Sequence, residues 1–142
     1  MTTRVAECNC GQLKVRVTGE PTRISVCHCL ACQRRTGSVF GMQARFDRAN
    51  VSIEGTSKQY VRIADSGNQC IQSFCPECGA TVYYQLNIAP DVFAVPVGAF
   101  ADPHFPAPRF SVYEERKHAW VQMPADVAGP AVNQSCSRPS AS

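Results

Sequence analysis

Long apolar runs are missing from this sequence of 142 residues. No segment approaches the roughly 20 apolar residues that a membrane-spanning helix needs. The first residues, Met1-Thr2-Thr3-Arg4-Val5, also lack the apolar stretch of a secretory signal, so we expect cytosolic residence and no membrane partner. Charged residues make up only 18% of the chain and hydrophobic residues 44%, a balance that excludes a disordered or fibrous protein and fits one globular domain.

Clustered positive charge is also missing. Basic residues outnumber acidic ones only 14 to 11, and no basic run is longer than Arg34-Arg35. Nucleic-acid-binding proteins usually concentrate their basic side chains on one face or stripe, so no nucleic-acid partner is expected. The formal charge of +3 fits a small anionic ligand at least as well as a polyanion.

Cysteine, in contrast, is abundant, with nine residues. An odd number cannot be fully paired within one chain, and in a reducing compartment closely spaced cysteines are more often metal ligands than disulfides. Seven of the nine fall into three clusters: Cys8-Asn9-Cys10, Cys27-His28-Cys29-Leu30-Ala31-Cys32 and Cys75-Pro76-Glu77-Cys78. A structural zinc takes four protein ligands and a reactive zinc three, so seven thiols suggest one site of each kind.

The spacing suggests how the thiols are shared. The three thiols of the middle cluster lie within six positions and can wrap one ion. Cys8 and Cys10 point to the same side of an extended segment, while Cys75 and Cys78 have the spacing of a zinc knuckle. Joining these two pairs at one ion would clamp the N-terminal strand to the middle of the chain. Spacing alone also permits other partitions, such as the first two pairs together.

Purely structural sites are an alternative, in which Cys70, His28 or His104 completes the second tetrahedron. We expect Cys70 to be a small buried residue instead. His28 lies between two ligands on a strand, so its ring should face away from the metal and support the ligands or the core. Cys136 lies in the C-terminal region and is expected to have no specific role.

The apolar pattern predicts a mainly β fold. Leu13, Val15 and Val17 alternate with charged residues, as in a half-buried strand. Further strands are expected at residues 24–27, 38–46, 51–53, 59–63, 71–74, 81–86, 92–97 and 109–113, and a short helical turn at 30–35. Trp120 is expected in the core or a pocket wall. From Pro124 the composition shifts to Pro, Ala, Ser and Gly, which predicts a domain over residues 3–123 and a disordered tail over 124–142.

Three motifs carry a resemblance to a known family: Cys8-Asn9-Cys10-Gly11, Cys27-His28-Cys29-Leu30-Ala31-Cys32-Gln33-Arg34-Arg35-Thr36-Gly37 and Phe74-Cys75-Pro76-Glu77-Cys78-Gly79. In this order they resemble the glutathione-dependent formaldehyde-activating enzyme (GFA) family, also called the centromere protein V/GFA domain family. Residues 97–103 are similar to its Gly-x-Leu-Asp-Asp-Pro segment, with Phe100-Ala101-Asp102 in place of Leu-Asp-Asp, and residues 117–120 to its closing Lys-x-x-Trp. The resemblance covers about residues 5–123.

The resemblance implies an Mss4-like fold of small antiparallel sheets with two zinc ions per chain. Its structural zinc ligands match Cys8, Cys10, Cys75 and Cys78, and the ligands of its reactive, catalytic zinc match Cys27, Cys29 and Cys32. The implied activity is that of a carbon–sulfur lyase, the condensation of glutathione with formaldehyde to S-hydroxymethylglutathione.

Glutathione carries two carboxylates, so cationic side chains should line its groove. Arg34 and Arg35, directly after the third ligand, are the first candidates, with Arg116 and Lys117 behind them; a solvated turn of helix explains the arginines equally well. Two other functions stay open. One is a zinc-stabilised binding module without turnover, and the other is a redox enzyme of the methionine-sulfoxide-reductase kind, which needs a cysteine outside the clusters as nucleophile.

Overall fold

The computed structural model describes residues 1–63 and 67–127 of the chain. Three strands form a small antiparallel sheet in the order β1-β2-β5: β1 (Thr3–Glu7), β2 (Lys14–Thr18) and β5 (Val51–Glu54). The larger sheet has seven strands: β3 (Arg23–Cys27), β4 (Gly41–Asp47), β6 (Lys58–Ile63), β7 (Gln69–Phe74), β8 (Thr81–Leu86), β9 (Ala89–Pro96) and β10 (Phe110–Val112).

The strand order of the larger sheet is β10-β3-β4-β9-β8-β7-β6, and its neighbours are antiparallel except for β10, which runs parallel to β3. The helices are short: α1 (Leu30–Thr36) and the 3-10 helices η1 (Arg48–Asn50), η2 (Val97–Phe100) and η3 (Glu114–Arg116). None of the helices in the described residues has the length and apolar character that crossing a bilayer requires. The expected mainly β, Mss4-like architecture of antiparallel sheets is confirmed, with one parallel pair added.

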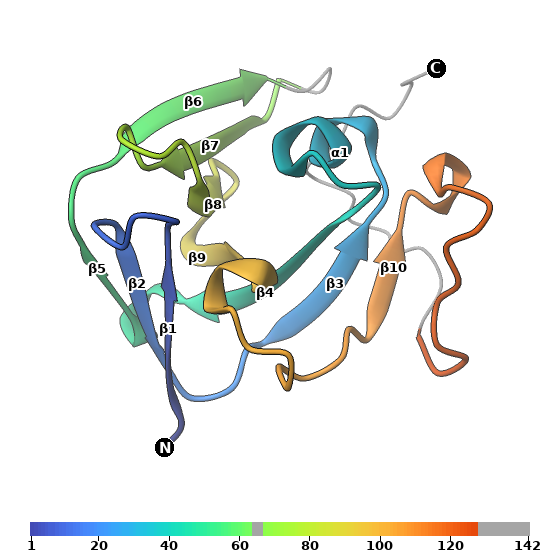
Figure 1. The fold of residues 1–142 in the computed structure, drawn as a ribbon, viewed down its shortest axis with the longest axis horizontal. Helices are drawn as coiled ribbons and strands as arrows, with labels where there is room; N and C mark the ends of the chain where they lie inside the picture. The colour runs from blue at the N-terminus through green and yellow to red at the C-terminus, as the bar shows by residue number, and fades with distance from the viewer. Residues whose placement is uncertain (64–66, 128–142) are drawn as a thin grey trace.

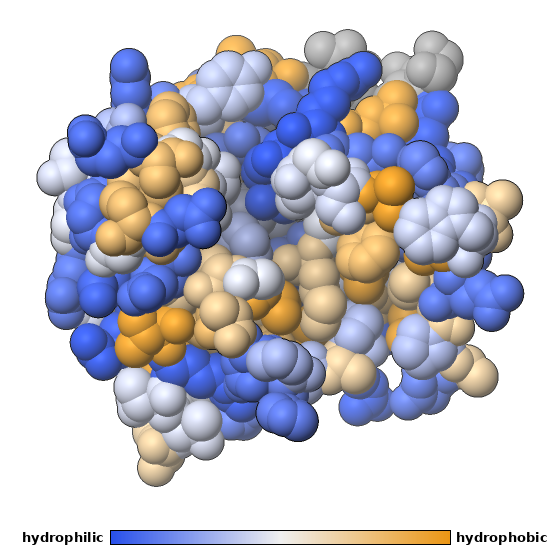
Figure 2. All heavy atoms as spheres, viewed as in Figure 1, coloured by the Kyte–Doolittle hydropathy of each residue, from blue (hydrophilic) through white to orange (hydrophobic). Residues whose placement is uncertain are grey.

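The main core lies between the two sheets. Strands β1, β2 and β5 stand on the left of Figure 1, and the larger sheet extends from β6 and β7 at the top to β3 and β10 on the right. The side chains that fill the space alternate along their strands, for example Val15 and Val17 of β2 against Ala44 and Phe46 of β4. In the same view, Figure 2 shows hydrophilic side chains along much of the outline and apolar ones in smaller groups between them. The opposite face of β3 and β4 is left for α1 and the candidate site.

The strand boundaries differ from the sequence prediction in a few places. Strand β1 was not among the predicted strands, because Thr3–Glu7 contains only two adjacent apolar residues and no alternation. The segment 38–40 is a loop, since α1 must turn back before β4 begins. Val97 begins η2 and does not extend β9. The expected disordered tail falls mostly on residues 128–142, which lie outside the described residues.

The prediction that Trp120 lies in the core is wrong. Its side chain is 71% exposed, while the following residue, Val121, is buried. The backbone N–H of Val121 donates to the carbonyl of His118, and this turn directs the valine inward and leaves the indole outside the core.

Ala101 adopts a left-handed conformation, with φ 50° and ψ 40°, directly after η2. We expect Ala101→Gly to raise the free energy of unfolding by about 0.5–1 kcal/mol, because an L side chain pays about 1–2 kcal/mol in this region and glycine only part of that in chain entropy. Urea unfolding followed by circular dichroism measures the change. Ala99→Gly, in η2 itself, is the matched control and should lower stability; an equal loss in both variants would contradict the assigned strain.

Candidate metal sites

Four thiols from two distant turns converge in the structure. The Sγ atoms of Cys8, Cys10, Cys75 and Cys78 all lie within 4.8 Å of one another. Cys10 Sγ is 3.6 Å from the Sγ atoms of both Cys8 and Cys75. Four sulfurs at about 2.3 Å from a tetrahedral zinc would be about 3.8 Å apart, so this four-cysteine group fits such an ion. The group could hold one metal ion. It joins the first cysteine pair of the chain to the last pair, one of the arrangements that the spacing allowed.

Each pair of this group lies in a tight turn closed by a glycine with positive φ. Cys8 and Cys10 lie in the turn between β1 and β2. The spacing had predicted an extended segment instead. Gly11 (φ 83°) donates its N–H to the carbonyl of Cys8 at 3.1 Å. Between β7 and β8, Gly79 (φ 81°) makes the same bond to Cys75 at 2.8 Å. Two hairpins, β1–β2 and β7–β8, therefore place their turns against each other.

The side chain of Gln12 supports the four-cysteine group, a role that the sequence pattern did not predict. Its Nε2 donates to Cys75 Sγ at 3.0 Å and to the Thr56 carbonyl at 2.7 Å, while its Oε1 accepts from the Thr56 N–H at 2.9 Å. Gly55 permits this approach, because a Cβ atom there would lie 1.9 Å from the carbonyl oxygen of Gln12. Only the position of Gln12 next to a cysteine turn could have hinted at this role.

Ionisation of the four thiols is uneven. Burial opposes ionisation of Cys75, but hydrogen bonds from Gln12 and from the backbone N–H groups of Cys78 and Glu77 lower its pKa to about 6. For Cys10, a backbone hydrogen bond at Gln12 favours the thiolate, yet the neighbouring thiols, first of all Cys8, raise its pKa to about 11. Several thiolates at this distance repel one another, so a cation is needed to hold them all in the ligand form.

The second group contains three buried thiols, those of Cys27, Cys29 and Cys32, whose Sγ atoms also lie within 4.8 Å of one another. Cys27 ends β3, and Cys29 is the N-cap of α1, where its Sγ accepts the N–H of Cys32 at 3.2 Å. Hydrogen bonds with Cys29 and Cys32, followed by burial, raise the pKa of Cys27. This three-cysteine group could hold one metal ion as well, because a cation would offset the repulsion between the three thiolates.

No fourth His, Cys, Asp or Glu ligand joins the three-cysteine group within residues 1–63 and 67–127. His28 is fully buried, but its Nε2 lies 2.9 Å from Ser111 Oγ and its ring packs edge-on against Phe40. Burial lowers the pKa of His28, which favours a neutral ring that supports the β3–β10 pair. His104 is exposed and is not part of the three-cysteine group, and its backbone N–H donates to Asp102 Oδ1 at 2.9 Å.

Cys70 is buried, as expected, in a separate cluster with Tyr84, Leu86 and Ala94. The residue is only 3% exposed, so its thiol does not face solvent as the nucleophile of a redox enzyme would. Cys136, the other cysteine that the redox alternative could use, lies outside the described residues.

The cationic candidates occupy different positions around α1. Arg34 is exposed, whereas Arg35 is half-buried and its guanidinium lies over the ring of Tyr84, with the two centres 5.3 Å apart. Gly41 allows this placement, since a Cβ there would come within 2.9 Å of Arg35 Nη2. Lys117 is half-buried at the end of η3, where its positive charge acts on the His28 ring.

Gln33 of α1 connects the η3 segment to the three-cysteine group, which the sequence pattern did not predict either. Its Nε2 donates to the His28 carbonyl at 2.9 Å and to the Arg116 carbonyl at 3.3 Å, and its Oε1 lies 3.1 Å from His118 Nε2. Tyr113, which packs against the cysteines, has φ 57°, a strained value of the kind that collects at functional sites.

Residues 3–116, well over half of the chain, match the family described as glutathione-dependent formaldehyde-activating enzyme. A crystal structure of a protein from Rhodobacter sphaeroides is similar in fold, with a TM-score of 0.52 and 18% sequence identity over 72% of this chain and 90% of that chain. No curated protein matches the sequence at a significant level. The family match and the two convergent cysteine groups agree, and the chain belongs to the glutathione-dependent formaldehyde-activating enzyme family.

Proposed function

We propose that this protein is a zinc-dependent enzyme of the carbon–sulfur lyase type, which condenses glutathione with formaldehyde to S-hydroxymethylglutathione at the three-cysteine group. The observation that carries this proposal is the difference between the two groups, four thiols in one and three in the other. A closed tetrahedral site is typical of structural zinc, and three protein ligands are typical of a zinc that meets substrate. Family membership supports the reaction type.

Zinc is the metal that this donor set favours. Thiolate ligands select zinc, copper(I) and iron–sulfur clusters, and the 3.6 Å separations of the sulfurs suit a single tetrahedral zinc. Backbone N–H groups donate to the Sγ atoms of Cys8, Cys29 and Cys75, which spreads the charge of bound thiolates. A zinc ion held by Cys27, Cys29 and Cys32 would supply an open coordination position, at which a substrate thiol gives up its proton.

The residues around this group would bind the anionic thiol and keep water away from it. Burial of all three cysteines excludes solvent from the ligand side. Arg34, Arg35 and Lys117 are the proposed glutathione contacts, and their positive charge would also favour the oxyanion that develops on formaldehyde. In the reaction one S–C bond forms, the π pair of the carbonyl moves to oxygen, and that oxygen takes up the proton that the thiol released.

Exchange spectroscopy with ¹³C-formaldehyde and glutathione tests the proposal. Zinc-loaded protein should interconvert formaldehyde and the hydroxymethyl adduct well above the spontaneous rate, and the excess should disappear after the metal is removed with a chelator and return with zinc. Binding of glutathione without any acceleration would contradict the proposal and favour a zinc-stabilised binding module.

A further inference from the structure

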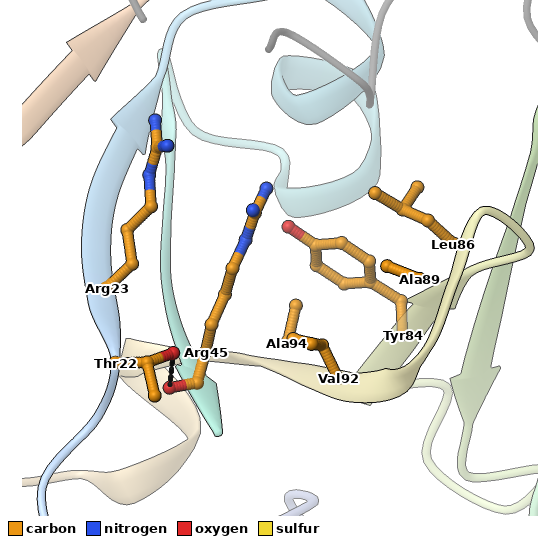
Figure 3. Close-up of a pocket in the computed structure, with 8 residues that line it drawn as sticks. All are labelled: Thr22, Arg23, Arg45, Tyr84, Leu86, Ala89, Val92 and Ala94. Carbon is orange, nitrogen blue, oxygen red and sulfur yellow. Dashed lines mark hydrogen bonds between the residues drawn. The ribbon is translucent and has the colours of Figure 1, made fainter. Parts of the chain in front are cut away.

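A pocket of about 250 Å³ opens on the face of the larger sheet that carries the three-cysteine group. Its walls come from β3, β4, β8 and β9 and the segments beside them, with α1 above it in Figure 3. Four apolar side chains line one side: Leu86, Ala89, Val92 and Ala94. The polar side is formed mainly by two arginines, Arg23 and Arg45.

The strand register brings these two arginines together. Arg23 of β3 is directly opposite Arg45 of β4, so both side chains leave the same face of the sheet. Burial and the nearby charge of Arg45 lower the pKa of Arg23. Like charges in directly opposite positions destabilise a sheet. The Arg23–Arg45 pair therefore lowers the stability of the fold, and packing gives no reason for it.

No acidic side chain of the described residues neutralises this pair. The ion pairs in that part of the chain belong to other cations, namely Arg4, Lys14 and Arg16. Arg23 lies over the ring of Phe110, 4.4 Å from its centre, but its Nε is buried and has no hydrogen-bond partner. A buried donor without an acceptor is destabilising, and an anion bound at this guanidinium would offset part of that cost.

The pocket lies on the same side of the sheet as the three-cysteine group. Cys27 is four residues after Arg23 on β3, so their side chains share a face and are about 13 Å apart along the strand. Between them, Gln43 Nε2 donates to Ser25 Oγ at 2.8 Å, which forms a polar floor. Figure 3 shows both guanidinium groups extending toward the α1 side, with the Tyr84 hydroxyl directed to the same end.

We infer that this Arg23–Arg45 pocket binds a carboxylate end of the thiol substrate while its sulfur lies at the three-cysteine group. The inference rests on the proposed function, which supplies a thiol with carboxylates as the ligand. Two guanidinium groups offer paired N–H donors that match a carboxylate, and the apolar wall suits a short aliphatic chain beside it. The volume is below the roughly 300–1,000 Å³ of pockets that enclose a whole ligand, as expected for one end of it.

Calorimetric titration with S-methylglutathione tests the inference on the zinc-loaded protein, because this ligand keeps both carboxylates but has no ionisable thiol. Arg45→Gln and Arg23→Gln should each weaken binding about 10- to 100-fold, the effect of losing one charge-assisted hydrogen bond. Arg16→Gln, which removes the same charge from the small sheet, should bind as the wild type does. Both pocket variants should unfold at the same or higher urea concentration, since each relieves the repulsion between the arginines.

Equal affinity of the wild type and both pocket variants would overturn the inference, and so would failure of the wild type to bind S-methylglutathione. A comparison of two thiols separates this result from failure of the proposed function. In Arg45→Gln, kcat/KM with glutathione should fall about 10- to 100-fold and kcat/KM with 2-mercaptoethanol, which has no carboxylate, should fall far less. If neither thiol is turned over by the wild type, the proposed function fails while the calorimetry still decides whether the pocket binds carboxylates.

Discussion

Cys75→Ser is expected to release the metal of the four-cysteine group and to unfold most of the protein. Cys10 and Cys75 are 65 residues apart, so a shared ion closes a long loop and holds the β1–β2 turn against the β7–β8 turn. Structural zinc contributes about 10–16 kcal/mol of apparent binding free energy, which is comparable with the whole stability of a domain, about 5–15 kcal/mol. Metal analysis and far-ultraviolet circular dichroism of the purified variant measure both effects.

Cys70→Ala is the matched control, because Cys70 is a buried cysteine outside both groups. It should keep two metal ions per chain and lose only about 1 kcal/mol of stability through the small cavity that it leaves. If Cys75→Ser also keeps two metal ions and the wild-type urea midpoint, the structural role of the four-cysteine group is wrong.

Cys29→Ala is expected to abolish turnover and leave the fold in place. The variant loses one of three ligands, so the metal of the three-cysteine group should leave and activity should fall to below about one hundredth of the wild-type value. The four-cysteine group is untouched, so one metal ion per chain should remain. Loss of the N-cap bond to Cys32 should cost about 1 kcal/mol, which is small against the whole stability.

Cys29→Ser separates the two roles of this residue. Serine is a good N-cap but a poor ligand for zinc, so this variant should recover the stability that Cys29→Ala loses and stay inactive. A folded Cys29→Ala protein with full activity would contradict the catalytic assignment. An unfolded one would show that the three-cysteine group holds the fold together.

Sequence spacing favoured the two cysteine groups that the structure brings together, without fixing them. The three thiols of the middle cluster are close in sequence, so they meet whatever the rest of the fold does. The two isolated pairs together supply the four ligands that a tetrahedral zinc site needs. Spacing alone did not exclude the other partitions. The fold does, because it places the turn between β1 and β2 beside the turn between β7 and β8. The helical turn at 30–35 was also predicted; it begins inside the cysteine motif, where Cys29 is the N-cap of α1 and Cys32 lies in its first turn.

The residues that the sequence could not reveal are brought together by contacts between segments that are far apart in the chain. Arg23 and Arg45 look like ordinary surface cations until the β3–β4 pairing places them opposite each other. Gln12 reaches Thr56 across 44 residues, and no local pattern encodes that contact. The prediction for Trp120 failed for a related reason. A large aromatic side chain is usually buried, but the backbone turn from His118 to Val121 decides which side chain enters the core.

X-ray absorption at the zinc edge, before and after glutathione is added to the two-zinc protein, tests the open coordination position most directly. The structure provides seven cysteine sulfurs for two ions, so the free protein should show a minor light-atom contribution beside the sulfur shell. We predict that glutathione replaces this contribution with one more sulfur, and that Cys29→Ala shows no such change. A full sulfur shell for both ions before glutathione is added, or a spectrum that glutathione leaves unchanged, would contradict the account.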